Sequence, residues 1–366
     1  MTKTTIDTAK TTDAGAMYEA LKARLGDVLP DFEIRHKAEL AAEINALKAE
    51  RGAVILGHNY MEPALYHSVC DFKGDSLELS RLAAEAPGDP IVFCGVRFMA
   101  ETAKILSPEK KVLLPTAKGG CSLAESITGE DVRRLKKKYP GVPVVTYVNT
   151  YADVKAETDI CCTSSNAAKV VESLDSDRVI FLPDEFLAKN VARETGKKII
   201  FPKVDGGMPA GLSGNGHGPG ESGELEYDIV GWRGRCEVHE QFTVEDIERV
   251  REQFPDVQVL AHPECSPEVV EASDFSGSTS ALIKAVKESD SERYLLLTEC
   301  SMADNIVAET EGKEMVRLCS VRCPHMGEIT LENVRDALLH DRYEVDVPEP
   351  TRTEARASIE RMLEIG

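Results

Sequence analysis

The sequence predicts an α/β protein with three homologous three-layer α/β/α domains, whose parallel sheets surround a pseudo-threefold axis. From residue 53 onward, short runs of Val, Ile and Leu alternate with amphipathic helical segments, which is the pattern of stacked βαβ units. The same succession of motifs then occurs three times along the chain, and such self-similarity indicates an internal repeat.

An extension, residues 1–36, comes before the first repeat. Two helical patterns occupy residues 14–50, and Gly52 follows the second one, as expected where a helix ends in a left-handed residue.

Each repeat begins with a strand that ends in polar residues: AVILGHNYMEP (53–63), VVTYVNTYADV (144–154) and QVLAHPECSPE (258–268). A cluster of small hydroxyl residues then opens a helix, in GDSLELSRLA, TSSNAAKVVESL and GSTSALIKAV. A second strand and a second helix follow. A third strand then leads to a cysteine, which is Cys121, Cys236 or Cys323.

Counting residues supports the repeat. The hydroxyl residue and the cysteine are 45 positions apart in the first and third units and 72 apart in the second. The excess is a glycine-rich stretch at about 203–231, which we interpret as a flexible insertion. The expected domains are therefore 37–121, 122–236 and 237–326, with the C-terminal segment 327–366 packing on the first.

Composition excludes several classes of protein. A formal net charge of −20 argues against general nucleic-acid binding, because a phosphate backbone would be repelled. No apolar run is long enough to cross a membrane, and the N-terminus lacks the apolar core of a secretory signal. We therefore expect a cytoplasmic protein. The acidic surplus fits an ordinary solvated surface or a high-salt cytoplasm, and the sequence leaves both open.

Three of the ten cysteines occupy equivalent positions in the three units. Three converging thiolates suit zinc or an iron–sulfur cluster, because both prefer soft sulfur ligands. A structural zinc would normally take four ligands, often from CxxC pairs, which are absent here. A [4Fe–4S] cluster held by three cysteines leaves one iron open as a Lewis acid. The alternative is that these thiols only fill equivalent core positions. The other seven cysteines are expected to be small apolar residues of the core: Cys70, Cys94, Cys161, Cys162, Cys265, Cys300 and Cys319.

Hydroxyl residues mark a second requirement of the site. Ser76, Ser164 and the pair Ser278–Thr279 each lie where a helix is predicted to start, as N-cap residues do. Helix N-termini attract anions through their free N–H groups and the helix dipole. Three of them around one cavity predict a small substrate with several acidic groups.

Polar residues at the ends of the first strands supply the candidate acid–base groups. The carboxyl ends of parallel strands meet at one edge of a sheet, where ligands bind. An isolated His or Tyr at such an end is usually structural, but here every unit contributes one. The set is His58, Asn59, Tyr60, Tyr147, Asn149, His262 and Glu264, with His239 close behind Cys236 and the less convincing His325 behind Cys323.

These motifs resemble the quinolinate synthase family, also known as the quinolinate synthetase A family. The resemblance rests on GHNYMEP, GDSLELS, YVNTYADVKA, CCTSSNA, GRCEVHE, HPEC, GSTSALI and CPHMGEITLENV, and it runs from about residue 37 to the C-terminus. The glycine-rich insertion and the N-terminal extension depart from the family pattern.

The resemblance implies a transferase that condenses iminoaspartate with dihydroxyacetone phosphate to quinolinate, phosphate and water in NAD biosynthesis. It implies one oxygen-sensitive [4Fe–4S] cluster per chain, bound by Cys121, Cys236 and Cys323. Substrate-binding positions carry over to His58, Ser76, Tyr147, Asn149, Ser164, His262, Glu264 and Thr279. Tyr60 and Glu264 resemble the acid–base residues, and His239 is placed with them as catalytic. Functional coupling to an L-aspartate oxidase or dehydrogenase stays open.

Two other classes of protein share some of these features. Radical enzymes that form diphthamide also have three cysteines in threefold pseudo-symmetry, but they would bind S-adenosylmethionine and a protein substrate. An iron–sulfur redox or sensor protein would not need three helix-terminus anion sites around its cluster. The dense set of small-anion contacts in HNY, YVN and HPE favours quinolinate synthase.

Overall fold

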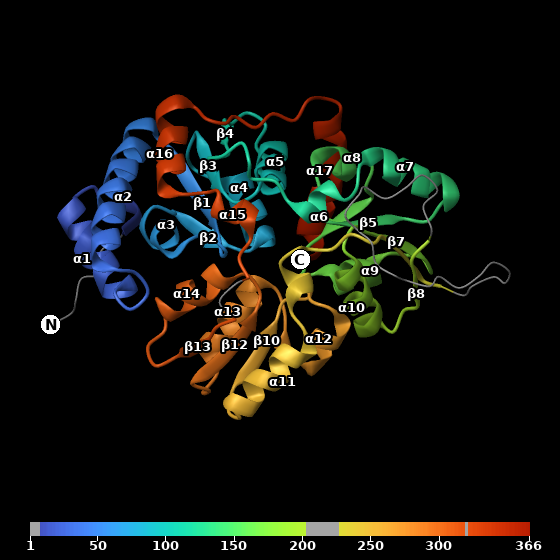
Figure 1. Cartoon of the computed structure of the whole chain (residues 1–366). Helices are drawn as coiled ribbons and strands as arrows, with labels where there is room; N and C mark the ends of the chain where they lie inside the picture. Colours follow the sequence, from blue (N-terminus) through green and yellow to red (C-terminus); the bar gives the residue numbers. More distant parts are fainter. Residues whose placement is uncertain (1–7, 203–226, 319–320) are drawn as a thin grey trace.

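The computed structural model describes residues 8–202, 227–318 and 321–366, which form an α/β protein with three parallel sheets (Figure 1). Figure 1 shows the first sheet at the upper left, the second on the right and the third below them. Most of the predicted insertion, as well as Cys319, lies outside the described residues.

The first and third sheets have the same strand order, with the second strand of each unit at one edge. The first sheet is ordered β2 (Phe72–Gly74), β1 (Val54–His58), β3 (Ile91–Cys94) and β4 (Val112–Leu113). The third is ordered β11 (Phe275–Ser276), β10 (Gln258–Ala261), β12 (Arg293–Leu297) and β13 (Glu314–Val316). All of their strand pairs are parallel. The shared order is what a repeated unit would produce.

The second sheet has this order with one strand added. It runs β6 (Ile160–Cys162), β5 (Val144–Tyr147), β7 (Val179–Leu182), β9 (Ile229–Gly231) and β8 (Ile199–Ile200). The strand beside β7, where the other sheets place their last strand, is therefore β9, and β8 is an extra edge strand. The predicted insertion extended to about residue 231, whereas its last residues form the buried strand β9.

The central strands β1, β3, β5 and β7 of the first two sheets are buried along their whole length, which explains why they read as continuous apolar runs. The edge strands β2, β6 and β11 were not expected from the sequence. They are only two or three residues long, too short to show a period.

Helices connect the strands in equivalent pairs. They are α4 (Ser76–Glu85) and α5 (Arg97–Leu106), α9 (Ala167–Ser173) and α10 (Glu185–Thr195), and α13 (Thr279–Glu288) and α14 (Cys300–Val307). In each unit a short helix precedes this pair: α3 (Pro63–Ser68), α8 (Ala152–Ala156) and α12 (Pro267–Ala272).

A capping threonine lies seven residues after each of the three equivalent cysteines, and a further helix begins at the next residue. The threonines are Thr128, Thr243 and Thr330, and each side chain accepts a hydrogen bond from the backbone N–H three residues later. The helices are α7 (Gly129–Lys138), α11 (Val244–Gln253) and α16 (Leu331–His340). The repeat therefore continues past each cysteine.

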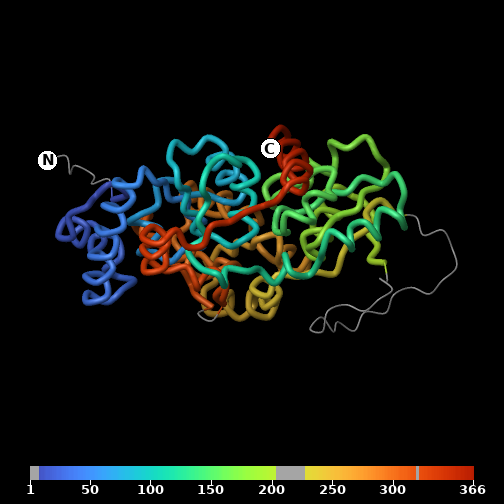
Figure 2. Tube along the Cα trace, turned by 90° about the horizontal axis from the view of Figure 1, so that it is seen from above, coloured from blue at the N-terminus to red at the C-terminus, as the bar shows by residue number. Residues whose placement is uncertain are grey.

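The two ends of the chain pack on different parts of the molecule. A short helix, η1 (Thr8–Lys10), precedes α1 (Ala14–Leu25), and α2 (Asp31–Arg51) ends at Gly52, which has a left-handed backbone with φ 66°. α16 contacts α2 and β3, whereas α17 (Thr351–Ile365) contacts α8 and β6 of the second sheet. Figure 2 shows the segment between these two C-terminal helices crossing the molecule. The C-terminal segment thus joins the first and second units.

Replacing Gly57 by alanine is expected to lower the melting temperature. Gly57 lies in β1, and an added Cβ would stand 2.3 Å from the sulfur of Cys70, closer than atoms can approach. Overpacking of this kind costs about 1–3 kcal/mol. Thermal unfolding of Gly57→Ala, of Cys70→Ala and of the double variant checks the cause. The sulfur contact is not the cause if Gly57→Ala costs as much when Cys70 is already alanine.

Candidate active site and metal centre

A central cavity lies where the three sheets meet, at the carboxyl ends of their strands. It encloses about 660 Å³ of space that no protein atom fills, including its opening to solvent. The residues that the family resemblance assigns to the site all line it: His58, Tyr60, Ser76, Cys121, Tyr147, Asn149, Ser164, Cys236, His239, His262, Glu264, Thr279 and Cys323. Tyr60 and His239, which are 179 positions apart in the chain, are thus neighbours in the cavity wall.

Loops after the first strand of each sheet supply most of the polar groups. His58 is the last residue of β1, Tyr147 is the last residue of β5, and His262 directly follows β10. These three strands are each the second in their sheet order, so their ends face the common centre. The parallel topology is the reason that equivalent sequence positions converge.

Each predicted metal ligand begins a short helical turn. Cys121 precedes α6 (Ser122–Glu125), Cys236 lies just before η2 (His239–Gln241), and Cys323 precedes α15 (Pro324–Gly327). In each turn, the sulfur accepts hydrogen bonds from the backbone N–H groups two and three residues later. The same local geometry therefore presents all three sulfurs to the cavity.

The three thiols resist ionisation in the absence of a cation. Burial raises the pKa of Cys121 to about 12 and that of Cys323 to about 11, and it raises the pKa of Cys236 well above its usual value. The charge of Cys323 further raises the pKa of Cys121, and that of Cys121 raises the pKa of Cys236. A bound metal centre would remove this penalty, because thiolates are its preferred ligands. The cysteine set therefore fits a metal cofactor.

One backbone hydrogen bond fixes each cysteine-bearing loop in the same way. The first residue of the second helix donates to the carbonyl oxygen two residues before the cysteine. The pairs are Arg97 N to Gly119 O at 2.7 Å, Glu185 N to Gly234 O at 2.8 Å, and Cys300 N to Val321 O at 3.2 Å. The pseudo-equivalence of the units thus extends to individual hydrogen bonds at the site.

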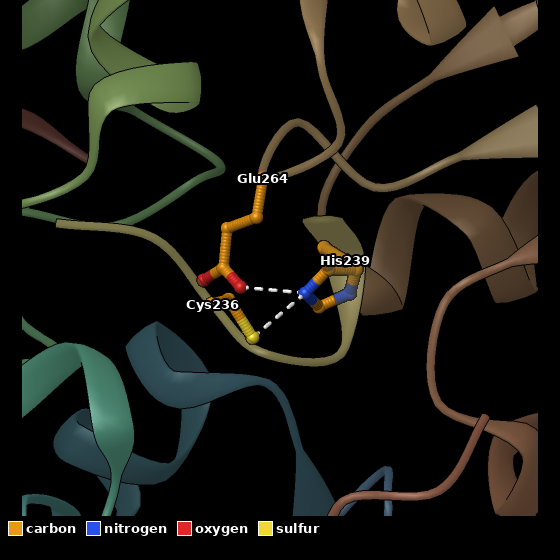
Figure 3. Close-up of side chains that lie close together, drawn as sticks. All are labelled: Cys236, His239 and Glu264. Carbon is orange, nitrogen blue, oxygen red and sulfur yellow. Dashed lines mark hydrogen bonds and ion pairs between the residues drawn. The ribbon is translucent and has the colours of Figure 1, made fainter. Parts of the chain in front are cut away.

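Glu264, His239 and Cys236 form a compact group on the wall of the cavity (Figure 3). The Nδ1 atom of His239 lies 2.7 Å from Oε2 of Glu264 and 3.2 Å from the sulfur of Cys236. One ligand atom of each residue lies within 4.8 Å of the others, so the group could itself hold a metal ion. Glu264 also accepts hydrogen bonds from Tyr147 OH at 2.6 Å and Asn149 Nδ2 at 3.2 Å.

A chain of hydrogen bonds continues from this group to Tyr60. Nε2 of His239 lies 2.9 Å from the hydroxyl of Thr298, which lies 2.5 Å from the hydroxyl of Tyr60. In the neutral ring, a proton on Nδ1 donates to Glu264, and Nε2 then accepts from Thr298. Glu264, His239, Thr298 and Tyr60 therefore form a continuous path for a proton.

Burial sets the protonation states of the cavity groups. It lowers the pKa of His58 to about 4 and that of His262 to about 3, so both imidazoles are neutral near pH 7. Burial and the Glu264 charge raise the pKa of Tyr60 and of Tyr147 well above the usual value, so both phenols stay protonated. Burial opposes ionisation of Glu264, but the attraction of His239 outweighs it and holds the pKa of that carboxyl below its usual range.

Of the hydroxyl residues predicted as N-caps, Ser278 caps its helix, whereas Ser76 and Ser164 do not. Ser278 is a cap, and its Oγ accepts from Ala281 N at 3.3 Å. Ser76 is instead the first residue of α4, because Asp75 caps that helix. Ser164 lies before the cap Asn166 of α9. Carboxylate and amide side chains cap helices as well as hydroxyls do, which is why the sequence could not place these caps to within a residue.

The structure adds residues to the site that the sequence did not indicate. Thr298 and Glu299 follow β12, the second strand of the third unit, where only the ends of first strands had been considered. Glu299 lines the cavity and caps α14 by accepting from Ser301 N at 2.7 Å. The sequence signal that would have found them is the presence of polar residues directly after a strand, searched for after every strand and not only after the first of each unit.

Two predicted polar residues do not line the cavity. His325 lies 3.1 Å from Glu237 through its Nε2, outside the cavity wall. Asn59 is 2% exposed and hydrogen bonds to Thr279 behind the wall. Among the described helices, none has the length and apolar character needed to span a membrane.

Comparison with known proteins identifies the family. Residues 42–364 match the family model described as quinolinate synthetase A protein. The quinolinate synthase of Sinorhizobium fredii is 50% identical over 349 residues, which cover 95% of this chain and 88% of the relative. Those of Caulobacter vibrioides and Xylella fastidiosa are also 50% identical, over 91% and 96% of this chain and 84% and 94% of theirs. The chain belongs to the quinolinate synthetase A family.

Proposed function

We propose that this chain is a quinolinate synthase, which condenses iminoaspartate with dihydroxyacetone phosphate and releases quinolinate, phosphate and water. The observation that carries the proposal is the cavity, because every residue that the family resemblance assigns to binding or chemistry lines it. Relatives that are half identical over nearly the whole chain bear the name quinolinate synthase. The proposed substrates are small anions, and the cavity lining includes hydroxyl and amide groups that can bind them.

Substrate binding is proposed to use hydroxyl groups and neutral donors. Ser76, Ser164 and Thr279 line the cavity from three different units. The neutral imidazoles of His58 and His262 each keep a ring N–H that can donate to a carboxylate or phosphate oxygen. These groups would let a protein of net charge −20 hold an anionic substrate locally.

Proton transfer is proposed to run between Glu264 and Tyr60. Enolisation, condensation and dehydration each require a base to remove a proton and an acid to return it. Glu264 is buried and ionised, so it can accept a proton, and Tyr60 is protonated, so it can give one. The hydrogen bonds through His239 and Thr298 connect the two, so either can be restored after it has acted.

The proposed cofactor is a [4Fe–4S] cluster held by Cys121, Cys236 and Cys323. When bound, such a cluster supplies a Lewis acid through the iron that no cysteine holds. We assign Cys236 to the cluster and keep His239 for proton transfer, because both ring nitrogens already have partners. The three units at 37–121, 122–236 and 237–326 are then proposed as domains that each give one ligand.

Anaerobically prepared protein is expected to contain about four iron atoms per chain and to form quinolinate, since one [4Fe–4S] cluster per chain is proposed. Iron and sulfide analysis, with quinolinate measured by chromatography, checks both. Protein treated with a chelator is the matched control and should form none. Iron-replete protein that makes no quinolinate from both substrates would refute the assignment.

A further inference from the structure

Asn59 joins the first and third units behind the cavity wall. It follows β1, and its side chain is 2% exposed. Its amide nitrogen donates to the hydroxyl of Thr279 at 2.9 Å and to that of Ser280 at 3.3 Å. Its amide oxygen accepts from the phenol of Tyr66 at 3.1 Å. The backbone of Asn59 is fixed as well, because its carbonyl oxygen accepts from Asn305 Nδ2 at 3.1 Å.

The surrounding hydrogen bonds determine which way the amide points. Ser280 donates its only hydroxyl hydrogen to a carboxylate oxygen of Glu78, at 2.6 Å. The Ser280 oxygen can then only accept from Asn59, so the group of Asn59 that faces it must be the amide nitrogen. Tyr66 donates to the amide oxygen on the other side. A reversed amide would leave Ser280 without a hydrogen to give.

This orientation also determines the direction of the Thr279 hydroxyl. A hydroxyl oxygen that accepts from Asn59 keeps its own hydrogen for another acceptor. Within the described residues, no protein group accepts that hydrogen. Thr279 is 3% exposed and lines the cavity at the first position of α13, beside the free N–H groups of that helix. The hydrogen is therefore available to a ligand in the cavity.

The corresponding hydroxyls of the other two units are not held in this way. Ser76 and Ser164 line the same cavity, and in the described part of the chain neither side-chain oxygen has a hydrogen-bond partner. Both residues are more exposed than Thr279. The third unit thus offers a buried hydroxyl that is oriented in advance, whereas the other two offer hydroxyls that can rotate.

We propose that Asn59 is a positioning residue, which holds the Thr279 hydroxyl as a hydrogen-bond donor to an anionic oxygen of the substrate. This inference rests on the proposed function and adds a residue outside the cavity wall to it. An oxygen of a phosphate or carboxylate group can only accept, so a hydroxyl that is already turned to donate needs no reorientation on binding. The ligand class is therefore an oxyanion.

Asn59→Asp tests the proposal by reversing the polarity at one position with almost no change of shape. The new carboxylate oxygen would accept the Thr279 hydrogen, so that the hydroxyl would turn its lone pairs toward the ligand. The KM for dihydroxyacetone phosphate, or the inhibition constant of inorganic phosphate or of quinolinate, is expected to rise roughly tenfold, the effect of losing one hydrogen bond to a charged group. The kcat should change by less than about threefold, because binding rather than chemistry is affected.

The three probes separate the sources of the oxyanion. A rise for dihydroxyacetone phosphate and inorganic phosphate assigns Thr279 to the phosphate group, whereas a rise for quinolinate alone assigns it to a carboxylate. Unchanged constants for all three in a folded, iron-loaded variant would overturn the proposal. Wild-type protein that makes no quinolinate would instead refute the proposed function, so the two failures are distinct.

A double-variant cycle shows whether Asn59 acts through Thr279. With Thr279→Val in place, Asn59→Asp is expected to change the same constants by less than twofold, because the hydroxyl that it orients is gone. Equal effects with and without the hydroxyl would contradict the proposed route. If Asn59→Asp fails to fold, Asn59→Leu is tested instead, since it removes the amide nitrogen that donates to Thr279 without adding a charge. It is expected to raise the same constants about threefold, and no rise would also overturn the proposal.

Discussion

Replacing Cys323 by serine is expected to abolish both iron binding and quinolinate formation. The sulfur of Cys323 accepts hydrogen bonds from backbone N–H groups of its own turn, and Cys323 lines the same cavity as Cys121 and Cys236. Serine keeps the size and the N–H acceptor but is a poor ligand for iron, which prefers thiolate in such clusters. Because three ligands hold the proposed cluster, losing one should reduce the iron content to near zero.

Cys300→Ser is the matched control in the same unit. Cys300 is partly buried and its sulfur lies 3.7 Å from Leu318 O, but it does not line the cavity. The control should keep the full iron content, as should Cys319→Ser, whose position lies outside the described residues. Iron analysis of anaerobic preparations decides the matter. Equal iron loss in Cys323→Ser and a control would mean that the ligand was assigned wrongly.

The converging site residues could be predicted because they follow from topology. Once three βαβ units are recognised, equivalent strand ends must face one edge, and the equivalent cysteines must follow them. His58, Tyr147 and His262 illustrate this, since each stands at the end of the second strand in its sheet order. The α/β class and the family membership were both confirmed.

Details that depend on tertiary contacts could not be predicted. Thr298 is one of many hydroxyls that follow a strand, and only its distances to His239 and Tyr60 distinguish it. The same holds for Asn59, which was grouped with the acid–base candidates but packs behind the wall. The strand β9 was missed because it follows a long glycine-rich stretch, where a three-residue strand has no recognisable period.

Glu264→Gln is expected to reduce kcat by roughly 10²–10⁴-fold, the usual effect of losing an acid–base group. In the native protein three donors converge on the carboxylate, from Tyr147, Asn149 and His239. Glutamine offers one oxygen and one NH₂ group in the same place, so one donor would face another donor. Burial would still raise the pKa of the Tyr60 phenol, but the further rise caused by the Glu264 charge would be lost.

The substitution should also reverse the proton path. With an NH₂ group opposite Nδ1, His239 would carry its proton on Nε2 and donate to Thr298 instead of accepting from it. Tyr60 would then lose its connection to a base, although its own position stays the same. Tyr147→Phe is the comparison variant, because it removes only one donor to Glu264 and should cost less.

Iron content separates this interpretation from a metal site at Cys236, His239 and Glu264. If Glu264 serves only in proton transfer, Glu264→Gln should hold as much iron as the wild type while its kcat falls. If the three residues bind a metal together, as their ligand atoms within 4.8 Å would allow, the same substitution should remove metal and activity in parallel. Parallel loss would contradict the acid–base role, because His239 would then be a ligand and could not carry the proton between Glu264 and Thr298.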